Sequence, residues 1–455
     1  MGAHTLIVTA KHLKEEEIRR SAIFPWDFPA LFGSLGHMTT TLIILGGAGD
    51  LAQRLLIPGI AEYVSVHGAD ITIVGAGRHE HDDYRAFVRD AAAPVDEKVA
   101  ERLAADAEFV VADATDREDL RNLLEGRSNV VLYFALSPAI AVDSIRALKD
   151  AELAEDITLA MEKPFGADAD DARELNQQLL DLVDEEQIFR VDHFLATSGT
   201  LNFKVLRSTN RLIASSWSNE DVESIRLVYN ETVALEGRAE FYESTGAAED
   251  MLQSHLLQTL ARILADDGTS PEEILRAIRP TDEVRRGRYT EGEVDGERVP
   301  SYVDEDGVDP DNGTETWFRV VVDVETEKWR GVPITLESGK AFGEDVKQIE
   351  VTFKRSGDNP NNTLTLAFDT EDVEITLNAA DPASEDCAQI TLHTDLAPVR
   401  MSAYGRVVKG ILERIDHLAV PAQAAELGWD VMEAIAQKLH RARMEEYPAG
   451  TVAID

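Results

Sequence analysis

A glycine-rich turn stands directly after the first clear strand pattern of the chain. The apolar run Leu42–Leu45 leads into the letters GGAGDLA, and a helical pattern follows. Glycine is needed where a backbone turns tightly and where a pyrophosphate must approach without a Cβ in the way. The amino end of the next helix offers N–H groups and a partial positive charge to phosphates. We therefore expect a dinucleotide site formed by Gly46, Gly47, Gly49, Asp50 and Leu51.

The second strand pattern, Ile71–Val74, runs into the letters GAGRH, which contain the basic residue Arg78. An NAD site usually carries an acidic residue near this point, which binds the ribose hydroxyls. A guanidinium instead forms a bidentate, charge-assisted pair with a 2′-phosphate. Arg78 therefore predicts NADP as the cofactor, and the alternative is an ordinary surface arginine at a strand end.

The positions of these motifs depend on two patterns of secondary structure. From Thr41 to about Arg190, apolar strand patterns alternate with amphipathic helical patterns, which predicts a parallel sheet covered by helices on both faces. Later runs such as Thr316–Val324 and Gln348–Lys354 alternate apolar and polar residues, which is typical of antiparallel strands buried on one face. We expect an α/β Rossmann-type N-terminal domain and an α+β C-terminal domain with a large, mainly antiparallel sheet.

The expected boundaries are 1–37 for an N-terminal extension, 38–192 for the nucleotide-binding domain and 193–455 for the α+β domain. The extension lacks the long apolar core of a secretory signal, and we interpret it as a tag or a disordered segment without chemistry. Asp282–Val308 is acidic and contains glycines, so we interpret it as an exposed excursion.

The composition excludes several classes of function. The chain has 455 residues, with 44 Lys and Arg against 85 Asp and Glu, which gives a formal net charge of −41. Such a polyanion repels nucleic acid and anionic membranes, so we expect neither as a partner, and a phosphate must bind in a local basic pocket. No apolar run reaches the roughly 18 to 20 residues that cross a bilayer. Cys387, the single cysteine, predicts a small core residue, no metal site and a reducing cytoplasm.

Several longer sequence blocks occur in a fixed order along the chain: GGAGDLAQRLLIPG, VGAGR, YFALSP, MEKPFG, FRVDHFLA, NETVALEGRAEFYESTGAAEDMLQSHLLQ and WRGVPITLESGKAF. Together they resemble the signature blocks of the glucose-6-phosphate dehydrogenase family, and the resemblance extends from Thr41 to the C-terminus. It implies oxidation of the C1 hydroxyl of glucose 6-phosphate to 6-phosphogluconolactone, with hydride transfer to NADP, as the first step of the oxidative pentose phosphate pathway. It also implies that residues 193–455 bind the substrate and form a homodimer or homotetramer.

Carried onto this chain, the resemblance implies that His255 is the catalytic base and that Asp250 holds and polarises its ring. A near-neutral base must touch a hydroxyl that loses its proton as a hydride departs. A carboxylate behind an imidazole fixes its tautomer and stabilises the imidazolium. Without the flanking motif, such a pair on an apolar helix is more often structural.

The resemblance also implies a set of substrate-binding residues: Lys163, His193, Thr197, Glu231, Asp250 and Lys340. Lys163 is further expected to contact the nicotinamide ribose, and Pro164 is a candidate for a cis peptide bond. The segment Asp192–Thr197 reads Asp-His-Phe-Leu-Ala-Thr, where the commonest family members have Asp-His-Tyr-Leu-Gly-Lys. A tyrosine hydroxyl and a lysine ammonium are therefore missing, while His193 is kept and hydroxyls such as that of Thr197 can still donate to the phosphate.

Two alternatives stay open. The first keeps the fold and the chemistry at C1 but changes the sugar to a different hexose or hexose derivative. The second is a non-catalytic relative that binds nucleotide and regulates a partner enzyme. The presence of His255, Asp250, Lys163 and the glycine turn argues against the second alternative.

Overall fold

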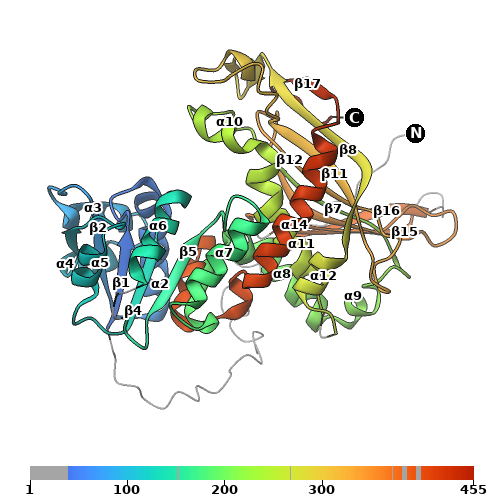
Figure 1. The fold of residues 1–455 in the computed structure, drawn as a ribbon. Helices are drawn as coiled ribbons and strands as arrows, with labels where there is room; N and C mark the ends of the chain where they lie inside the picture. Colours follow the sequence, from blue (N-terminus) through green and yellow to red (C-terminus); the bar gives the residue numbers. More distant parts are fainter. Residues whose placement is uncertain are drawn as a thin grey trace.

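The computed structural model describes residues 39–149, 151, 153–266, 268–370, 372–381, 387–395 and 401–454. The extension predicted over residues 1–37 lies outside this range. Figure 1 shows a smaller sheet with its helices on one side of the molecule, a larger sheet on the other, and a group of helices between them. The α/β part and the α+β part that the sequence predicts are both present, whereas the predicted boundaries between them stay predictions.

The first sheet has six strands in the order β3-β2-β1-β4-β5-β6, and every neighbouring pair is parallel. Its strands are β1 (Thr40–Leu45), β2 (Ile71–Gly77), β3 (Glu108–Val111), β4 (Val130–Phe134), β5 (Thr158–Glu162) and β6 (Ile188–Val191). The strand order reverses between β1 and β4, and ligands of such sheets bind at this reversal, beyond the carboxyl ends of the strands. The predicted doubly wound parallel sheet is confirmed.

Helices connect these strands, and aspartates begin several of them. They are α2 (Ile57–His67), which continues the π-helical turn η1 (Ala52–Leu56), α3 (Tyr84–Ala92), α4 (Glu97–Ala105), α5 (Arg117–Leu124), α6 (Pro138–Leu148) and α7 (Ala169–Leu180). The carboxylates of Asp83, Asp96, Asp116 and Asp168 accept backbone N–H groups at the starts of α3, α4, α5 and α7. Each such cap contributes about 1 kcal/mol relative to alanine, so part of the acidic surplus stabilises helices.

The second sheet has nine strands in the order β16-β15-β14-β13-β7-β12-β11-β8-β17. They are β7 (Val222–Asn230), β8 (Ile278–Thr290), β11 (Trp317–Val324), β12 (Ile334–Gly339), β13 (Val346–Phe353), β14 (Thr363–Ala367), β15 (Asp372–Ala380), β16 (Cys387–Asp395) and β17 (Met444–Pro448). Two neighbouring pairs, β7 with β12 and β8 with β17, are parallel, and the other described pairs are antiparallel. The large, mainly antiparallel sheet is therefore confirmed.

Two sequence-based interpretations of this part are wrong. Much of Asp282–Val308 is not an exposed excursion, because its first residues belong to β8, which pairs with β11 and β17. The sequence does not indicate this strand, because most of its side chains are polar or charged. One of them, the Arg285 guanidinium, binds the Glu445 carboxylate on the neighbouring strand at 2.7 and 2.9 Å. Cys387 is exposed at the start of the edge strand β16 rather than buried in a core.

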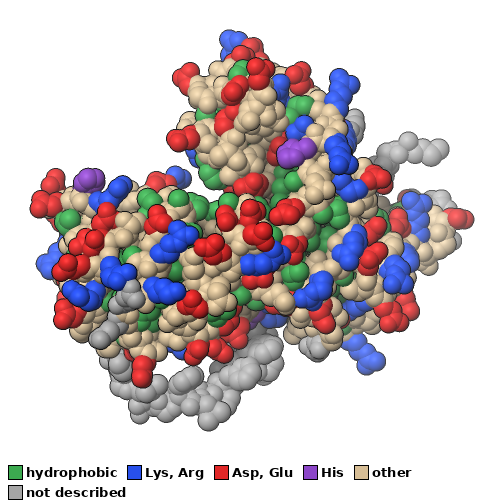
Figure 2. Space-filling view, viewed as in Figure 1, with side chains coloured by type: hydrophobic (Ala, Val, Ile, Leu, Met, Phe, Trp, Pro, Cys, Tyr) green, Lys and Arg blue, Asp and Glu red, His purple; other side chains and the backbone are tan. Residues whose placement is uncertain are grey.

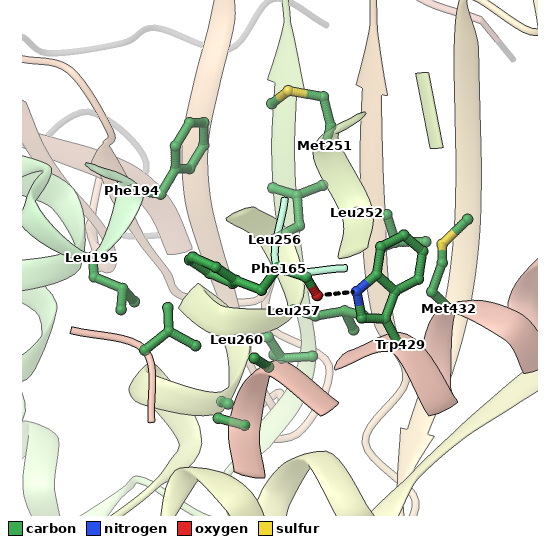
Figure 3. Packing of buried hydrophobic residues seen from close by; sticks show 14 of the residues in the cluster. Phe165, Phe194, Leu195, Met251, Leu252, Leu256, Leu257, Leu260, Trp429 and Met432 are labelled. Atoms are coloured by element: carbon green, nitrogen blue, oxygen red, sulfur yellow. Dashed lines mark hydrogen bonds between the residues drawn. The ribbon is translucent and has the colours of Figure 1, made fainter. Parts of the chain in front are cut away.

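The helices of the second part include α8 (Ser198–Thr209), α10 (Ala239–Ala248), the π-helical segment η4 (Glu249–Leu256), α11 (Leu257–Leu264), α12 (Pro271–Ala277), α13 (Ala403–Glu413) and α14 (Ala422–Leu439). Several of these helices pack between the two sheets, whereas α13 packs against α2 of the first part. Figure 3 shows Leu252, Leu256 and Leu257 packed beside Trp429 of α14. The Trp429 indole donates a hydrogen bond of 2.9 Å to the Phe165 carbonyl, so α14 is joined to the segment that follows β5.

The surface carries the acidic surplus of the composition. Figure 2 shows carboxylates distributed over both halves of the visible face, with lysine and arginine side chains interspersed among them. Among the described residues, no helix is both long and apolar enough to cross a membrane.

Candidate active site

The central feature of the site is a buried contact between His255 and Asp192. Asp192 directly follows β6 and caps the short 3-10 turn η3 (His193–Ala196), while His255 lies on η4. The Nδ1 atom of His255 lies 2.5 Å from Oδ1 of Asp192, and the two residues are 2% and 0% exposed. Single π-helical turns are frequent at functional sites, because they rotate a side chain relative to a regular helix.

The surroundings of this pair set its protonation. The Phe194 ring stacks on the His255 imidazole with a centroid distance of 4.1 Å and an angle of 12°. Burial lowers the pKa of His255, which favours the neutral ring. Burial alone would raise the pKa of Asp192, but the contact with His255 outweighs it and the pKa is lowered. A neutral imidazole with an ionised carboxylate on Nδ1 is the state that a general base requires.

The prediction that Asp250 holds His255 is wrong. Asp250 lies on η4 five residues before His255, and its Oδ1 accepts a hydrogen bond of 2.7 Å from the Lys163 ammonium. Lys163 also donates to the Asp250 carbonyl at 3.1 Å. Burial would raise the pKa of Asp250, but the Lys163 charge outweighs it and the pKa is lowered. Asp192 holds the imidazole instead, and it is 63 residues away in the chain.

Lys163 and Asp250 come from opposite parts of the molecule. Lys163 directly follows β5 of the parallel sheet, whereas Asp250 lies on the helical layer below the larger sheet. The Lys163–Pro164 peptide bond is cis, as the sequence predicts. A cavity of about 540 Å³ reaches Lys163 and Glu162 from between α6 and α7, and Glu249 of η4 also lines it. This side of Lys163 therefore faces open space at the carboxyl end of the parallel strands.

Two further predicted residues lie together at the edge of the larger sheet. Glu231 directly follows β7 and Lys340 directly follows β12, and these neighbouring strands are parallel with Asn230 opposite Gly339. The Lys340 ammonium donates to Glu231 at 2.7 Å. Lys347 of β13 lies 3.8 Å from the same carboxylate and 3.0 Å from Asp345. Sequence reasoning missed Lys347, because none of the sequence blocks that carry the resemblance includes β13.

His193 adjoins the pair formed by His255 and Asp192. Its ring centroid lies 4.8 Å from that of His255 and 5.5 Å from that of Tyr404, whose hydroxyl donates to Glu162 at 3.1 Å. Burial, aided by the nearby His255, lowers the pKa of His193 to about 3, so this ring is neutral as well. Asp192, His193 and His255 could together offer three ligand atoms to a metal ion, but the contact between Asp192 and His255 already explains their proximity.

Thr197 lies close to His193 but its hydroxyl is engaged. It donates to the Phe194 carbonyl at 2.8 Å and lies 3.0 Å from the Thr200 hydroxyl, and the residue is 4% exposed. In this arrangement Thr197 stabilises its own segment, so its predicted contribution to phosphate binding requires the hydroxyl to turn away from Phe194.

The glycine turn directly follows β1, as the sequence predicts, and it lies beside the point where the strand order reverses. Gly46 has a φ of +81°, and a Cβ there would lie 2.3 Å from the Ala135 carbonyl oxygen. A Cβ on Gly47 would lie 2.5 Å from the Gly75 Cα. The helix then begins at Asp50 and Leu51, and among the described residues no side chain caps it. The Asp50 carboxylate is exposed and contacts Arg54 at 3.3 Å. Because none of the described side chains caps this helix start, its backbone N–H groups fit a pyrophosphate.

Arg78 is exposed directly beyond the end of β2. It is close enough to Asp113, which follows β3, to help lower the pKa of that carboxylate, although hydrogen bonds from Thr115 lower it more. Arg78 therefore lies at the same edge of the parallel sheet as the glycine turn.

Comparison with known proteins decides the family. Residues 43–202 match the family model described as glucose-6-phosphate dehydrogenase, NAD binding domain. Residues 204–453 match the model described as glucose-6-phosphate dehydrogenase, C-terminal domain. The chain belongs to the glucose-6-phosphate dehydrogenase family. A nicotinamide cofactor follows from this membership and from the NAD-binding domain.

Individual members of the glucose-6-phosphate dehydrogenase family are similar over nearly the whole chain. Glucose-6-phosphate 1-dehydrogenases of Gluconobacter oxydans and Dickeya dadantii are 32% and 30% identical, over 90% of this chain and 93% and 94% of theirs. A solved structure of the Mycobacterium avium enzyme is 26% identical, with a TM-score of 0.79 over 91% of this chain and 95% of that one. Another dehydrogenase of the family, solved with glucose 6-phosphate, shares the fold with a TM-score of 0.82 at 24% identity, again over 91% and 95%.

Proposed function

We propose that this protein oxidises the C1 hydroxyl of glucose 6-phosphate to 6-phosphogluconolactone and that His255, held by Asp192, is the base. The observation that carries the proposal is the 2.5 Å contact between these two buried side chains. It engages Nδ1, and among the described residues Nε2 of His255 has no hydrogen-bond partner. Membership of the glucose-6-phosphate dehydrogenase family supplies the sugar phosphate and the reaction.

In this mechanism the proton of the C1 hydroxyl passes to Nε2 of the neutral His255 ring. The resulting imidazolium is stabilised by the Asp192 carboxylate, which also keeps the Nδ1 proton in place and so fixes the tautomer. The nicotinamide group, when bound, accepts a hydride from C1. The Phe194 ring on one face of the imidazole excludes water, which strengthens the electrostatic contact between the pair.

We further propose that the two ion pairs around this base position the sugar. The Lys163–Asp250 pair and the Lys340–Glu231 pair each contain one donor and one acceptor, which suits hydroxyls that both donate and accept. Lys163 and Asp250 are 21% and 15% exposed, so both are accessible to a small ligand without leaving the protein interior. Lys347 adds a second cation beside Glu231.

For the cofactor we propose NADP. Its pyrophosphate is assigned to the turn Gly46–Gly49 and the helix that begins at Asp50, and its 2′-phosphate to Arg78. The exposed guanidinium of Arg78 and the reversal of strand order beside the turn support this assignment. The cavity that reaches Lys163 offers space for the nicotinamide. A homodimer or homotetramer and a cytoplasmic location stay predictions.

Steady-state kinetics test the proposed reaction. The purified protein is assayed with NADP and with NAD against glucose 6-phosphate, free glucose and other hexose phosphates. We expect the highest kcat/KM with glucose 6-phosphate and NADP. A higher kcat/KM with a different hexose would favour the first alternative from the sequence, and nucleotide binding without turnover of any sugar would favour the second.

A further inference from the structure

The segment Asp192–Thr197 offers no positively charged side chain to the phosphate group of the proposed substrate. His193 is neutral because burial lowers its pKa to about 3, Phe194 has no hydroxyl, and the Thr197 hydroxyl donates to a carbonyl of its own segment. The protein as a whole carries a formal charge of −41 and repels anions at long range. A phosphate that binds beside His193 therefore requires a positive charge from another element.

That charge comes from α13. The Arg406 guanidinium donates through Nη1 to the Ala196 carbonyl at 2.9 Å and to the Ser198 hydroxyl at 3.0 Å. Both acceptors flank Thr197, although Arg406 lies more than 200 residues later in the chain. Two residues earlier on the same helix, the Tyr404 ring stacks on His193. Arg406 is thus placed against the segment that follows the catalytic Asp192.

Arg406 also lines a cavity of about 420 Å³, together with the side chains of Thr197 and Ser198. Phe368 forms another wall, and its ring packs against Phe194, which stacks on the His255 imidazole. Two aromatic side chains in succession, Phe368 and Phe194, therefore connect the cavity with the proposed base. Arg406 is the single basic residue among the described residues of its lining.

Two acidic residues, Glu62 and Asp369, line the same cavity and add negative charge to it. Glu62 accepts hydrogen bonds of 2.7 and 2.8 Å from the backbone and hydroxyl of Ser402. Asp369 accepts one of 3.1 Å from the Tyr229 hydroxyl and lies 3.7 Å from the Lys347 ammonium. Both carboxylates are engaged in these contacts, so we expect an incoming dianion to approach the side of the cavity that Arg406, Thr197 and Ser198 form.

We propose that Arg406 binds the phosphate group of the sugar phosphate and, together with the Ser198 hydroxyl, determines the preference for a phosphorylated hexose. A guanidinium suits this task because its planar fork forms bidentate, charge-assisted bonds with phosphate oxygens. The inference rests on the proposed oxidation of glucose 6-phosphate and assigns its phosphate subsite.

The test compares Arg406→Gln and Arg406→Lys with the wild-type protein on glucose 6-phosphate and on free glucose. Losing a charge-assisted contact is expected to raise KM for glucose 6-phosphate in Arg406→Gln about 10- to 100-fold. The kcat/KM for free glucose should stay near its wild-type value, and Arg406→Lys should fall between. Lys409→Gln is the matched control, because it removes one positive charge from the same helix outside this cavity.

A second variant separates phosphate binding from a purely structural role. Thr197→Lys returns an ammonium to the same cavity wall, so in the Arg406→Gln background it should lower KM for glucose 6-phosphate relative to KM for free glucose. Equal losses with both sugars together with a lowered unfolding temperature, or no loss with either, would overturn the proposal. A wild-type protein that oxidises neither sugar would instead contradict the proposed reaction.

Discussion

The Nδ1 atom of His255 lies 2.5 Å from the Oδ1 atom of Asp192, and this contact joins the two parts of the molecule. Asp192 extends from the last strand of the parallel sheet, whereas His255 lies on the π-helical segment beneath the larger sheet. The relative position of the two parts therefore sets the geometry of the proposed base. Any change that shifts one part against the other acts directly on this distance.

Replacing each of the two candidate carboxylates distinguishes their roles. In Asp192→Asn the amide donates to Nδ1 and places the ring proton on Nε2, so the imidazole can no longer accept the substrate proton. We expect kcat to fall on the order of 10²- to 10⁴-fold with little change in KM. Asp250→Asn should instead raise KM, because it removes the partner of Lys163 and keeps the base intact.

The comparison requires both variants to be folded, which circular dichroism and thermal unfolding check. Steady-state kcat and KM for glucose 6-phosphate are then measured at one saturating cofactor concentration. A loss of kcat that is larger in Asp250→Asn than in Asp192→Asn would restore Asp250 as the partner of the histidine.

Arg78 is expected to discriminate between the two cofactors. In Arg78→Gln the charge-assisted contact with the 2′-phosphate is lost, which should raise KM for NADP about 10- to 100-fold. KM for NAD should stay nearly constant, because NAD carries no phosphate at that position. Arg54→Gln serves as the control, since Arg54 is exposed on the first turns of the helix after the glycine turn and binds Asp50. Equal changes for both cofactors in Arg78→Gln would contradict the assignment.

Glu249 is expected to destabilise the protein at alkaline pH. Burial and the neighbouring Glu315 and Asp250 raise its pKa to about 7 from the model-peptide value of 4.5. The folded state therefore binds a proton more tightly than the unfolded state, and this contribution to stability is lost as pH rises through about 7. Glu249→Gln should raise the free energy of unfolding at pH 8 and leave it nearly unchanged at pH 4.5.

Denaturant unfolding at several pH values checks this prediction, with Glu240→Gln, an exposed position on the neighbouring helix α10, as the control. If Glu249→Gln shifts the stability by the same amount at pH 4.5 and pH 8, the raised pKa is not its cause.

Local sequence patterns predict the fold correctly where the type of a residue indicates whether its side chain is buried. The apolar strands and the turn at Gly46 can be predicted, because a buried parallel strand requires apolar residues and a positive φ favours glycine. Strand β8 cannot be predicted in this way, because it carries charged side chains such as Arg285, which is paired with Glu445. Cys387 was misjudged because residue type alone does not show that a strand lies at a sheet edge.

The active site was only partly predictable for a related reason. His255, Lys163 and Lys340 lie in recognisable blocks, and the structure gathers them with their carboxylates. The partner of His255 was misassigned because nearness in sequence favoured Asp250, whereas the contact with Asp192 spans 63 residues. Arg406 has no local signal at all, since its proximity to Ser198 depends on the packing of α13 against η3.

The pH dependence of kcat/KM in the wild-type protein and in His255→Asn tests the central claim most directly. Burial lowers the pKa of His255, so the wild-type profile should fall at acidic pH, below the usual range of histidine, as the base becomes protonated. His255→Asn should lower kcat on the order of 10²- to 10⁴-fold, remove this acidic limb and keep KM for glucose 6-phosphate close to wild type. A variant that retains wild-type kcat and the same acidic limb would show that His255 is not the base.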